Sequence, residues 1–399
     1  MKYAYVVGTF DTKGEELRYV AERIQEAGAK PVTVDVSSKP SSTAADVPNT
    51  EVAGYHPSDP DFLGKIDDRG QAVKMMSEAL GEYLVSRDDL GGAIGIGGSG
   101  NTALVTGAMR RLDVGVPKIM VSTVASGDVA PYVGANDIAM MYSVTDVAGI
   151  NRISRRVLGN AAHAIAGMVA NPVPEAPDAK PTLGMTMFGV TTPAVTAVRK
   201  ALEGEFDVLV FHATGTGGQS MEKLIDSGMI SHVIDITTTE ICDLLLGGIL
   251  SAGEDRMGSI IRQGMPYVGS VGALDMVNFG AKDTVPAKHK DRNLYVHNEN
   301  VTLMRTTPDE SELIGKWIGE KLNQMTGPVR FLLPEKGVSL IDAEGQPFHD
   351  PEADEALFRA IEETTSQNDK RQVRRLPHNI NDQEFADALV AAFREVHGL

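Results

Sequence analysis

The chain has 399 residues, 42% of them hydrophobic and 23% charged, which indicates a folded globular protein and excludes a disordered or fibrous one. A formal net charge of −17 argues against general binding to nucleic acid or anionic membranes, because both attract clustered lysine and arginine. A bound nucleotide stays possible because it needs only a local positive potential.

Nothing in the sequence predicts export or membrane insertion. Residues 1–8 carry one lysine and a short apolar run, which is too brief for the core of a signal peptide. No uncharged apolar stretch approaches the roughly 18 residues that a membrane span requires. The single cysteine, Cys242, cannot form an intrachain disulfide, which suits a reducing compartment. We therefore expect a cytoplasmic protein with no nucleic-acid or membrane partner.

The length favours two domains, because 399 residues exceed one typical core. Residues 171–181 contain four prolines and little apolar content, so neither a helix nor a central strand is comfortable there. We place the boundary in this segment. The prediction is a first Rossmann-like, nucleotide-binding domain at 1–175 and a second Rossmann-like domain with C-terminal helices at 182–399.

In the first half, apolar runs and helical periodicity alternate. They predict strands at 3–7, 30–36, 92–96 and 118–122 and helices at 15–27, 74–85 and 101–111. A helix-compatible stretch at 147–169 closes this half. Residues 37–68, rich in Pro, Asp, Ser and Thr, are predicted to form a long surface excursion.

The second half repeats the alternation, with strands at 183–188, 206–211, 233–236 and 267–271 and helices at 194–202, 220–227 and 239–246. An alternating strand at 301–307 leads into Thr307-Pro308-Asp309-Glu310, a capping signal for a helix at 313–322. A strand at 330–333 and a helix at 384–396 follow. The pattern predicts an α/β fold of two doubly wound Rossmann-like domains, with mostly parallel sheets and an interdomain cleft.

Three kinds of strand-to-helix junction recur in both halves in the same order. The pairs are Gly8–Lys13 with Phe188–Pro193, Gly97–Gly100 with Gly215–Gly218, and Ser122–Ala125 with Ser270–Ala273. The intervals between junctions differ, so the likeness is one of architecture and not a sequence repeat.

The junction Gly95–Thr102 is the first candidate for chemistry. It follows a predicted strand and opens a predicted helix, so backbone N–H groups and the helix dipole can meet a phosphate. Ser99 and Thr102 add hydroxyl donors. The spacing matches neither the P-loop nor the dinucleotide fingerprint, and the alternative is that the glycines only permit a tight turn.

The junction Phe211–Gly218 is the second candidate. His212 could bond a phosphate or act as an acid or base, since its pKa lies near neutrality; Glu222 follows one turn into the next helix. A histidine that is only hydrogen-bonded to backbone at a strand edge is the alternative.

Other polar residues carry weaker signals. Residues 235–243 gather carboxylates and hydroxyls that could hold Mg²⁺, but helix capping explains the same letters and is favoured. No Cys/His spacing suggests zinc. Arg305 could grip a carboxylate or phosphate, with a surface ion pair as the alternative. Ser122 lies in no nucleophile-elbow motif, so a hydrolase triad has little support.

Taken together, these junctions resemble an ATP-binding family, the one that includes the amino-terminal half of the tomato mosaic virus resistance protein. The matching blocks are residues 8–14, 97–102, 117–123, 187–193, 211–215, 275–280 and 297–307, so the resemblance covers essentially the whole chain. It implies two Rossmann-like subdomains, ATP between or beside them and a homodimer. In plants a related region is fused to a TIM-barrel domain, so a separate TIM-barrel partner protein is a further expectation.

The resemblance also implies a set of binding residues. Phosphate contacts fall to Gly97, Gly98, Ser99, Gly100, Asn101 and Thr102. First-loop contacts fall to Thr9, Phe10 and Asp11, with Phe10 beside the base. Further contacts come from Ser126 and Gly127 and, in the second domain, from Thr214, Gly215, Gly217 and Gly218.

Three functions compete. The first is an ATP-binding protein whose nucleotide, with Mg²⁺ as a further candidate ligand, switches binding to a partner. The second is an ATP-dependent phosphotransferase or hydrolase acting on an organic acid, with His212, Glu222 or Asp11 as acid–base and Arg305 holding the substrate. The third is a sugar-nucleotide enzyme, which rests on fold analogy alone.

Overall fold

The computed structural model describes residues 2–39, 44–174 and 179–399. The chain divides into two compact units, Met1–Glu175 (unit 1) and Ala176–Leu399 (unit 2), and each is described by itself. The cleft expected between two domains stays a prediction.

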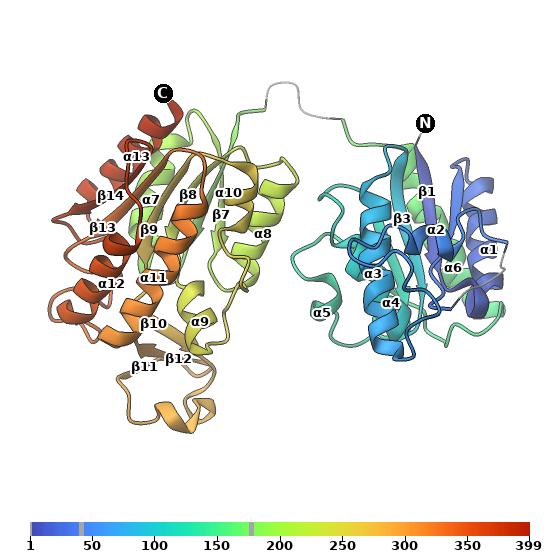
Figure 1. The fold of residues 1–399 in the computed structure, drawn as a ribbon, viewed down its shortest axis with the longest axis horizontal. Coiled ribbons are helices and arrows are strands. Elements are labelled where there is room, and N and C mark those ends of the chain that lie inside the picture. The colour runs from blue at the N-terminus through green and yellow to red at the C-terminus, as the bar shows by residue number, and fades with distance from the viewer. Residues whose placement is uncertain (1, 40–43, 175–178) are drawn as a thin grey trace. The chain divides into compact units, whose positions relative to one another are not determined.

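Unit 1 is a parallel five-stranded sheet in the order β2-β1-β3-β4-β5 with helices on both faces (Figure 1). The strands are β1 (Tyr3–Gly8), β2 (Pro31–Asp35), β3 (Leu90–Gly97), β4 (Lys118–Ser122) and β5 (Ala139–Tyr142). The helices are α1 (Phe10–Glu26), α2 (Asn49–Ala53), α3 (Arg69–Val85), α4 (Ser99–Met109), α5 (Ala130–Val133) and α6 (Arg152–Ala170). Helices α1 and α6 share one hydrophobic cluster with the sheet, and α2, α3 and α4 share another on the opposite face.

Unit 2 is a parallel six-stranded sheet in the order β14-β13-β9-β8-β6-β7. Its strands are β6 (Thr182–Met187), β7 (Asp207–His212), β8 (His232–Thr237), β9 (Tyr267–Gly272), β13 (Val329–Pro334) and β14 (Arg371–Leu376). The flanking helices are α7 (Thr192–Leu202), α8 (Thr216–Asp226), α9 (Glu240–Leu246), α10 (Gly258–Gln263), α11 (Pro308–Gln324), α12 (Pro351–Thr364) and α13 (Gln383–His397). Short 3₁₀ turns lie at Gly189–Thr191, Lys282–Thr284 and Ala287–His289.

A separate antiparallel sheet, in the order β10-β12-β11, extends unit 2 (Figure 1). Its strands are β10 (Met276–Phe279), β11 (Leu294–Asn298) and β12 (Val301–Arg305). The strand expected at 301–307 thus exists as β12, in the middle of this small sheet. It pairs on one side with β11, which precedes it in a tight hairpin, and on the other with β10.

Both parallel sheets are wound alike. Counted by their order within each unit, the strands read 2-1-3-4-5 across the sheet, with a sixth strand added in unit 2. The order reverses between β1 and β3 in unit 1 and between β6 and β8 in unit 2. In open parallel sheets ligands bind at this reversal, beyond the carboxyl ends of the strands. The α/β, doubly wound fold expected from the sequence is confirmed.

This winding corrects one of the three junction pairs. Gly97–Gly100 follows the third strand of unit 1, whereas Gly215–Gly218 follows β7, the second strand of unit 2. The two glycine junctions therefore occupy different positions in otherwise equivalent sheets. The two junctions have similar glycine-rich sequences because glycine is common wherever a strand turns tightly into a helix, so the similarity does not indicate equivalent positions.

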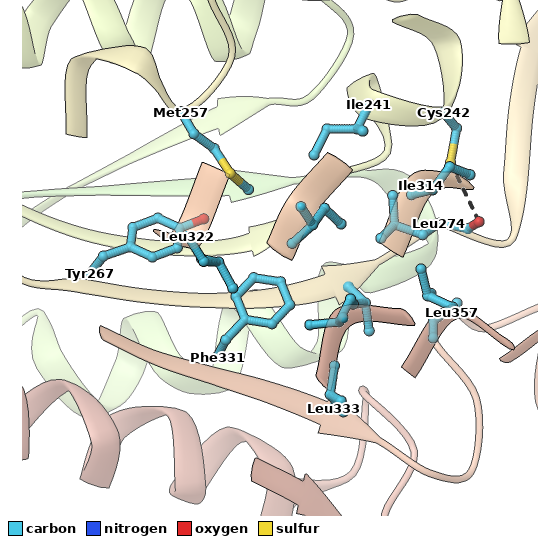
Figure 2. Close-up of a cluster of buried hydrophobic side chains, with 14 of the residues drawn as sticks. Ile241, Cys242, Met257, Tyr267, Leu274, Ile314, Leu322, Phe331, Leu333 and Leu357 are labelled. Carbon is cyan, nitrogen blue, oxygen red and sulfur yellow. Dashed lines mark hydrogen bonds between the residues drawn. The ribbon is translucent and has the colours of Figure 1, made fainter. Parts of the chain in front are cut away.

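The largest core lies in unit 2, on the face that carries α8 to α12 (Figure 2). Strand residues such as Tyr267 and Phe331 pack there against Ile314 and Leu322 of α11. Cys242 is fully buried among them and its thiol donates to the carbonyl of Leu274 at 3.4 Å. Because both faces of these strands are covered, their residues are buried, including the polar Ser270 and Arg330.

The helix expected near 313–322 is α11, and its capping box is present. Thr307 Oγ1 accepts from the Glu310 N–H at 3.3 Å, and the Glu310 carboxylate accepts from the Thr307 N–H at 2.9 Å. Pro308 stands at the first helical position, where a missing N–H costs nothing.

The surface excursion predicted at 37–68 is wrong for part of its length. Val47, Val52 and Phe62 are at most 7% exposed and belong to the core of unit 1, and α2 forms there. Val47 also pairs with β2 through an N–H to Thr33 O and an accepted bond from Asp35 N, so this segment covers the sheet edge. The prediction rested on the overall polar composition of the segment and so overlooked its few apolar residues.

Among the residues that the structure describes, no helix is long and apolar enough to cross a membrane.

Candidate functional site

The junction from β3 into α4 lies at the sheet reversal of unit 1. Gly97 has φ +156°, and a Cβ there would lie 2.8 Å from Asn101 Cβ, so the fold itself requires this glycine. Gly98 is the N-cap of α4, with φ −83° and no side-chain cap. Any residue could adopt that backbone conformation.

Gly98 and Gly100 are not required by the fold. A Cβ on Gly98 would find only Thr123 Oγ1 within 4 Å, at 3.8 Å, and one on Gly100 only Arg69 Nη2, at 3.9 Å. Neither has a positive φ. Gly100 is the second residue of α4, where alanine forms helix more readily than glycine, so α4 alone does not favour a glycine there. The space above this turn is therefore open to a group from outside the fold.

The first turn of α4 is also electropositive. The N–H groups of Ser99, Gly100 and Asn101 have no acceptor within the helix, and the turn contains no acidic residue. Arg69, exposed at the start of α3, lies beside Gly100, and no ion pair of Arg69 is found within residues 2–39, 44–174 and 179–399. A helix N-terminus, free N–H groups and a guanidinium together suit an anion.

Side chains tie this turn to the neighbouring strand. Thr102 is fully buried, and its hydroxyl bonds Gly98 O at 2.9 Å and Ser122 Oγ, at the end of β4, at 2.6 Å. Asn101 donates from Nδ2 to Ile96 O at 2.6 Å, while its Oδ1 is buried without a partner in the described part of the chain. Thr102 and Asn101 thus hold the turn in place.

The first loop, after β1, is built differently from expectation. Phe10 is 4% exposed and its ring belongs to the core on the α1 face, so it does not present a surface to a base. Its N–H donates to the buried Asp35 carboxylate at 3.1 Å, and the Asp11 N–H donates to Ser37 Oγ at 3.3 Å. The Asp11 side chain is exposed, and the Thr9 and Thr12 hydroxyls bond each other at 2.9 Å.

Ser126 and Gly127 lie exposed in the turn after β4. A Cβ on Gly127 would meet only Val124 O, at 3.7 Å. This turn is therefore open like that of Gly98 and Gly100, and it follows the strand next to β3.

The second glycine junction serves the fold of unit 2. The N–H groups of Gly215 and Gly218 both donate to Glu240 Oε1, at 2.8 and 3.0 Å. A Cβ on Gly217 would overlap the His212 carbonyl, and one on Gly218 would overlap the Glu240 carboxylate. These glycines are needed for packing, and the two N–H groups expected to bind phosphate already have an acceptor. The Thr214 hydroxyl likewise bonds His212 O, at 3.2 Å.

Glu240 belongs to a buried network centred on Arg256. The guanidinium bonds Asp235 at 2.7 Å, Glu240 at 2.9 Å and Glu222 at 3.1 Å. Glu222 also accepts from the N–H groups of Met257 and Ser259. Burial raises the pKa of Glu222 and of Glu240, with the charge of Arg256 opposing the shift. Glu222, expected as an acid–base, is therefore a structural partner of Arg256.

His212 is exposed at the end of β7 and its ring stacks on Phe188, with centroids 5.4 Å apart. Partial burial lowers its pKa, so the neutral imidazole is favoured.

Arg305 is 4% exposed and lies in a cluster of carboxylates. It bonds Asp354 at 2.8 Å, Asp342 at 3.1 Å and the Phe348 carbonyl at 2.7 Å. Its N–H donors are thus used inside unit 2, and no pair of them is left to bind a substrate.

The carboxylates considered for Mg²⁺ also have partners inside unit 2. Asp243 accepts from the Asn278 N–H at 2.7 Å and side-chain amide at 3.0 Å, and burial raises its pKa to about 7. Within the described residues, no group of three His, Cys, Asp or Glu side chains is placed to hold a metal.

Two residues that sequence reasoning missed lie at this edge of unit 1. Arg69 precedes Gly100 by 31 positions, so no local pattern joins them. Val144, in the loop after β5, has a φ of +66° and is 57% exposed; nothing in the sequence marks it.

The fold and this site define an α/β protein of two doubly wound units. The first unit has an open glycine-rich junction, and Arg69, which forms no ion pair among the described residues, lies beside it. The chain belongs to the uncharacterised protein family UPF0261. The model of the N-terminal domain of that family matches residues 2–174, and the model of its C-terminal domain matches residues 180–397.

Bacterial relatives match this chain over nearly the whole length of both proteins. A UPF0261 protein of Rhizobium meliloti is 56% identical and one of Mesorhizobium japonicum 58% identical, each over 99% of both chains. The tomato mosaic virus (ToMV) resistance protein Tm-1 of Solanum lycopersicum is 43% identical over 98% of this chain, which matches 55% of that protein.

Among solved structures, UDP-N-acetylglucosamine 2-epimerase from Rickettsia bellii aligns over 68% of this chain and 78% of its own, with 11% identity and a TM-score of 0.23. A likeness of that size supports no inference about function.

Proposed function

We propose that this protein binds a nucleoside triphosphate, ATP first of all, with its phosphates on the first turn of α4 in unit 1. The observation that carries the proposal is the pair Gly98 and Gly100, which the fold does not require and above which the space is open. A Cβ at either position would stand where a phosphate oxygen approaches the backbone N–H groups.

Charge and topology support the same choice. Arg69 lies beside Gly100, and a guanidinium binds phosphate oxygens through two parallel hydrogen bonds. The turn lies at the reversal of strand order, where open α/β sheets bind ligands. Asp11, exposed in the first turn of α1, would bind Mg²⁺ through water when the ion accompanies ATP.

The proposal is one of binding and not of turnover. Glu222 and Arg305, two of the side chains expected to act on a substrate, have internal partners. No observation in either unit favours the sugar-nucleotide alternative.

The test is calorimetric titration of the full chain with ATP and with UTP, with and without Mg²⁺, followed by an assay for phosphate release. We expect saturable binding that favours ATP, without release. Absence of ATP binding under all these conditions would remove the proposal.

A glycine substitution separates binding from folding. We expect Gly100→Ala to raise the free energy of unfolding slightly, by at most about 1 kcal/mol, and to weaken ATP binding at least tenfold, because the new methyl group blocks the phosphate. The control is Gly167→Ala in α6, an exposed helical glycine with nothing within 4 Å of an added Cβ. It should stabilise the fold similarly and leave the affinity unchanged. Equal affinities of the two variants would contradict the proposed location.

Arg69→Ala should weaken ATP binding about tenfold and reduce its salt dependence, because one charge-assisted contact is lost. Arg18→Ala, at an exposed arginine of α1, is the matched control and should change neither.

A further inference from the structure

Val144 has an unusual backbone conformation for its residue type. Of the residues that the structure describes, three other than glycine have positive φ, namely Val144 (+66°), Met257 (+70°) and Ala273 (+57°). Met257 and Ala273 are completely buried, so packing holds them. Val144 is 57% exposed, and a β-branched residue in the left-handed region is an outlier.

The turn around Val144 is closed by two short bonds. Thr145 N–H donates to Ser143 O at 2.8 Å, and Ser143 Oγ donates to Thr145 O at 2.6 Å. A turn of three residues with positive φ at its centre is the rare, strained kind of γ-turn. Glycine would adopt it without strain, so the fold alone gives no reason for a valine.

Hydrogen bonds connect this turn to the proposed phosphate site. Ser143 N–H donates to Ser122 O at 3.1 Å, and Ser122 Oγ bonds Thr102 Oγ1, in the first turn of α4, at 2.6 Å. Val144 follows β5, which lies two strands from β3 in the sheet. Two strand spacings correspond to about 10 Å along the carboxyl edge.

In the opposite direction along this edge, the Phe10 ring and the Asp35 carboxylate are engaged within the fold. Towards β2, the ring of Phe10 is buried in the core, and the carboxylate of Asp35 accepts from the N–H groups of Phe10 and Ser37. Towards β4 and β5, by contrast, the turn at Gly127 is open and Val144 is exposed. We therefore place the rest of a nucleotide whose phosphates lie on α4 on this side.

We propose that Val144 contacts the face of the nucleotide base and so sets a preference for a purine over a pyrimidine, whose smaller ring would cover less of the side chain. This inference rests on the proposed function. Residues held in strained conformations concentrate at ligand sites, where the strain is part of how a contact is positioned.

The test compares full-length variants with two probes, ATP and inorganic tripolyphosphate. For Val144→Gly we expect about tenfold weaker ATP binding, unchanged tripolyphosphate binding, and a ligand-free Tm about 2–4 °C higher because the strain is released. Val144→Ile keeps the apolar contact and should keep the wild-type affinity for ATP. The ratio of ATP to UTP affinity should fall towards one in Val144→Gly alone.

The outcomes separate the two proposals. If the wild-type chain binds ATP and Val144→Gly binds it equally well, the role of Val144 is overturned while the proposed function stands. If Val144→Gly loses affinity for ATP and tripolyphosphate by the same factor, the contact is not with the base, and the inference also falls. If the wild-type chain binds neither probe, the proposed function is overturned and this inference with it.

Discussion

Glycines that look alike in the sequence have different physical causes at the residue scale. Gly217 and Gly218 make room for the His212 carbonyl and the Glu240 carboxylate, whereas Gly98 and Gly100 leave space that nothing in the described fold fills. Only the positions of distant atoms separate the two cases. The same holds for charged residues, since the donors of Arg305 are consumed inside unit 2 while Arg69 lies exposed.

At this scale, Arg256 should dominate the stability of unit 2. Arg256→Met leaves the carboxylates of Asp235, Glu240 and Glu222 buried without their common cation. Removing one partner of a buried ionic group costs about 3–5 kcal/mol. Urea denaturation followed by far-UV circular dichroism measures the loss.

Arg199→Met is the control for Arg256. Arg199 pairs with Glu203 at 3.3 Å on the surface of α7, where both side chains are more than half exposed, so a change below about 1 kcal/mol is expected. Similar losses in both variants would show that the buried network is not special.

At the scale of elements, strand and helix positions follow from local chemistry, but edges and partners do not. Most residues of the central strands are buried because helices cover both faces of each parallel sheet. The pairing of β10 with β12 and the segment that covers β2 depend on residues 14 or more positions apart, such as Val47 and Thr33.

Helix α13 supplies a prediction about pH. His397, at its end, lies against His232 of β8, with ring centroids 4.5 Å apart. Burial, followed by the charge of His232, lowers the pKa of His397 from 6.5 to about 4. Between those values the unfolded chain binds more protons than the folded one, so stability falls as the pH falls through this window.

We therefore expect the wild-type chain to lose unfolding free energy relative to His397→Phe as the pH decreases from 6.5 to 4. Urea denaturation at several pH values measures it. A constant difference across this range would show that His397 is not the group responsible.

At the scale of the whole molecule, each unit has its own parallel sheet and its own hydrophobic clusters. A segment with a complete core can fold alone. We expect a fragment of residues 1–174 to unfold cooperatively on heating and, under the proposed function, to bind ATP, whereas residues 180–399 should fold but not bind it. Circular dichroism and calorimetry test both fragments, and an unfolded 1–174 fragment would contradict the expectation.

The sequence by itself determined the α/β class, the alternation of strands and helices, the cap of α11 and the glycine-rich junction after β3, because propensity, periodicity and capping act over a few residues. The tertiary structure decided which glycine junction is open, which carboxylates and arginines are paired, and that Phe10 is core while Val144 is exposed and strained. Those outcomes depend on contacts between residues tens to hundreds of positions apart, and local patterns carry no record of such contacts.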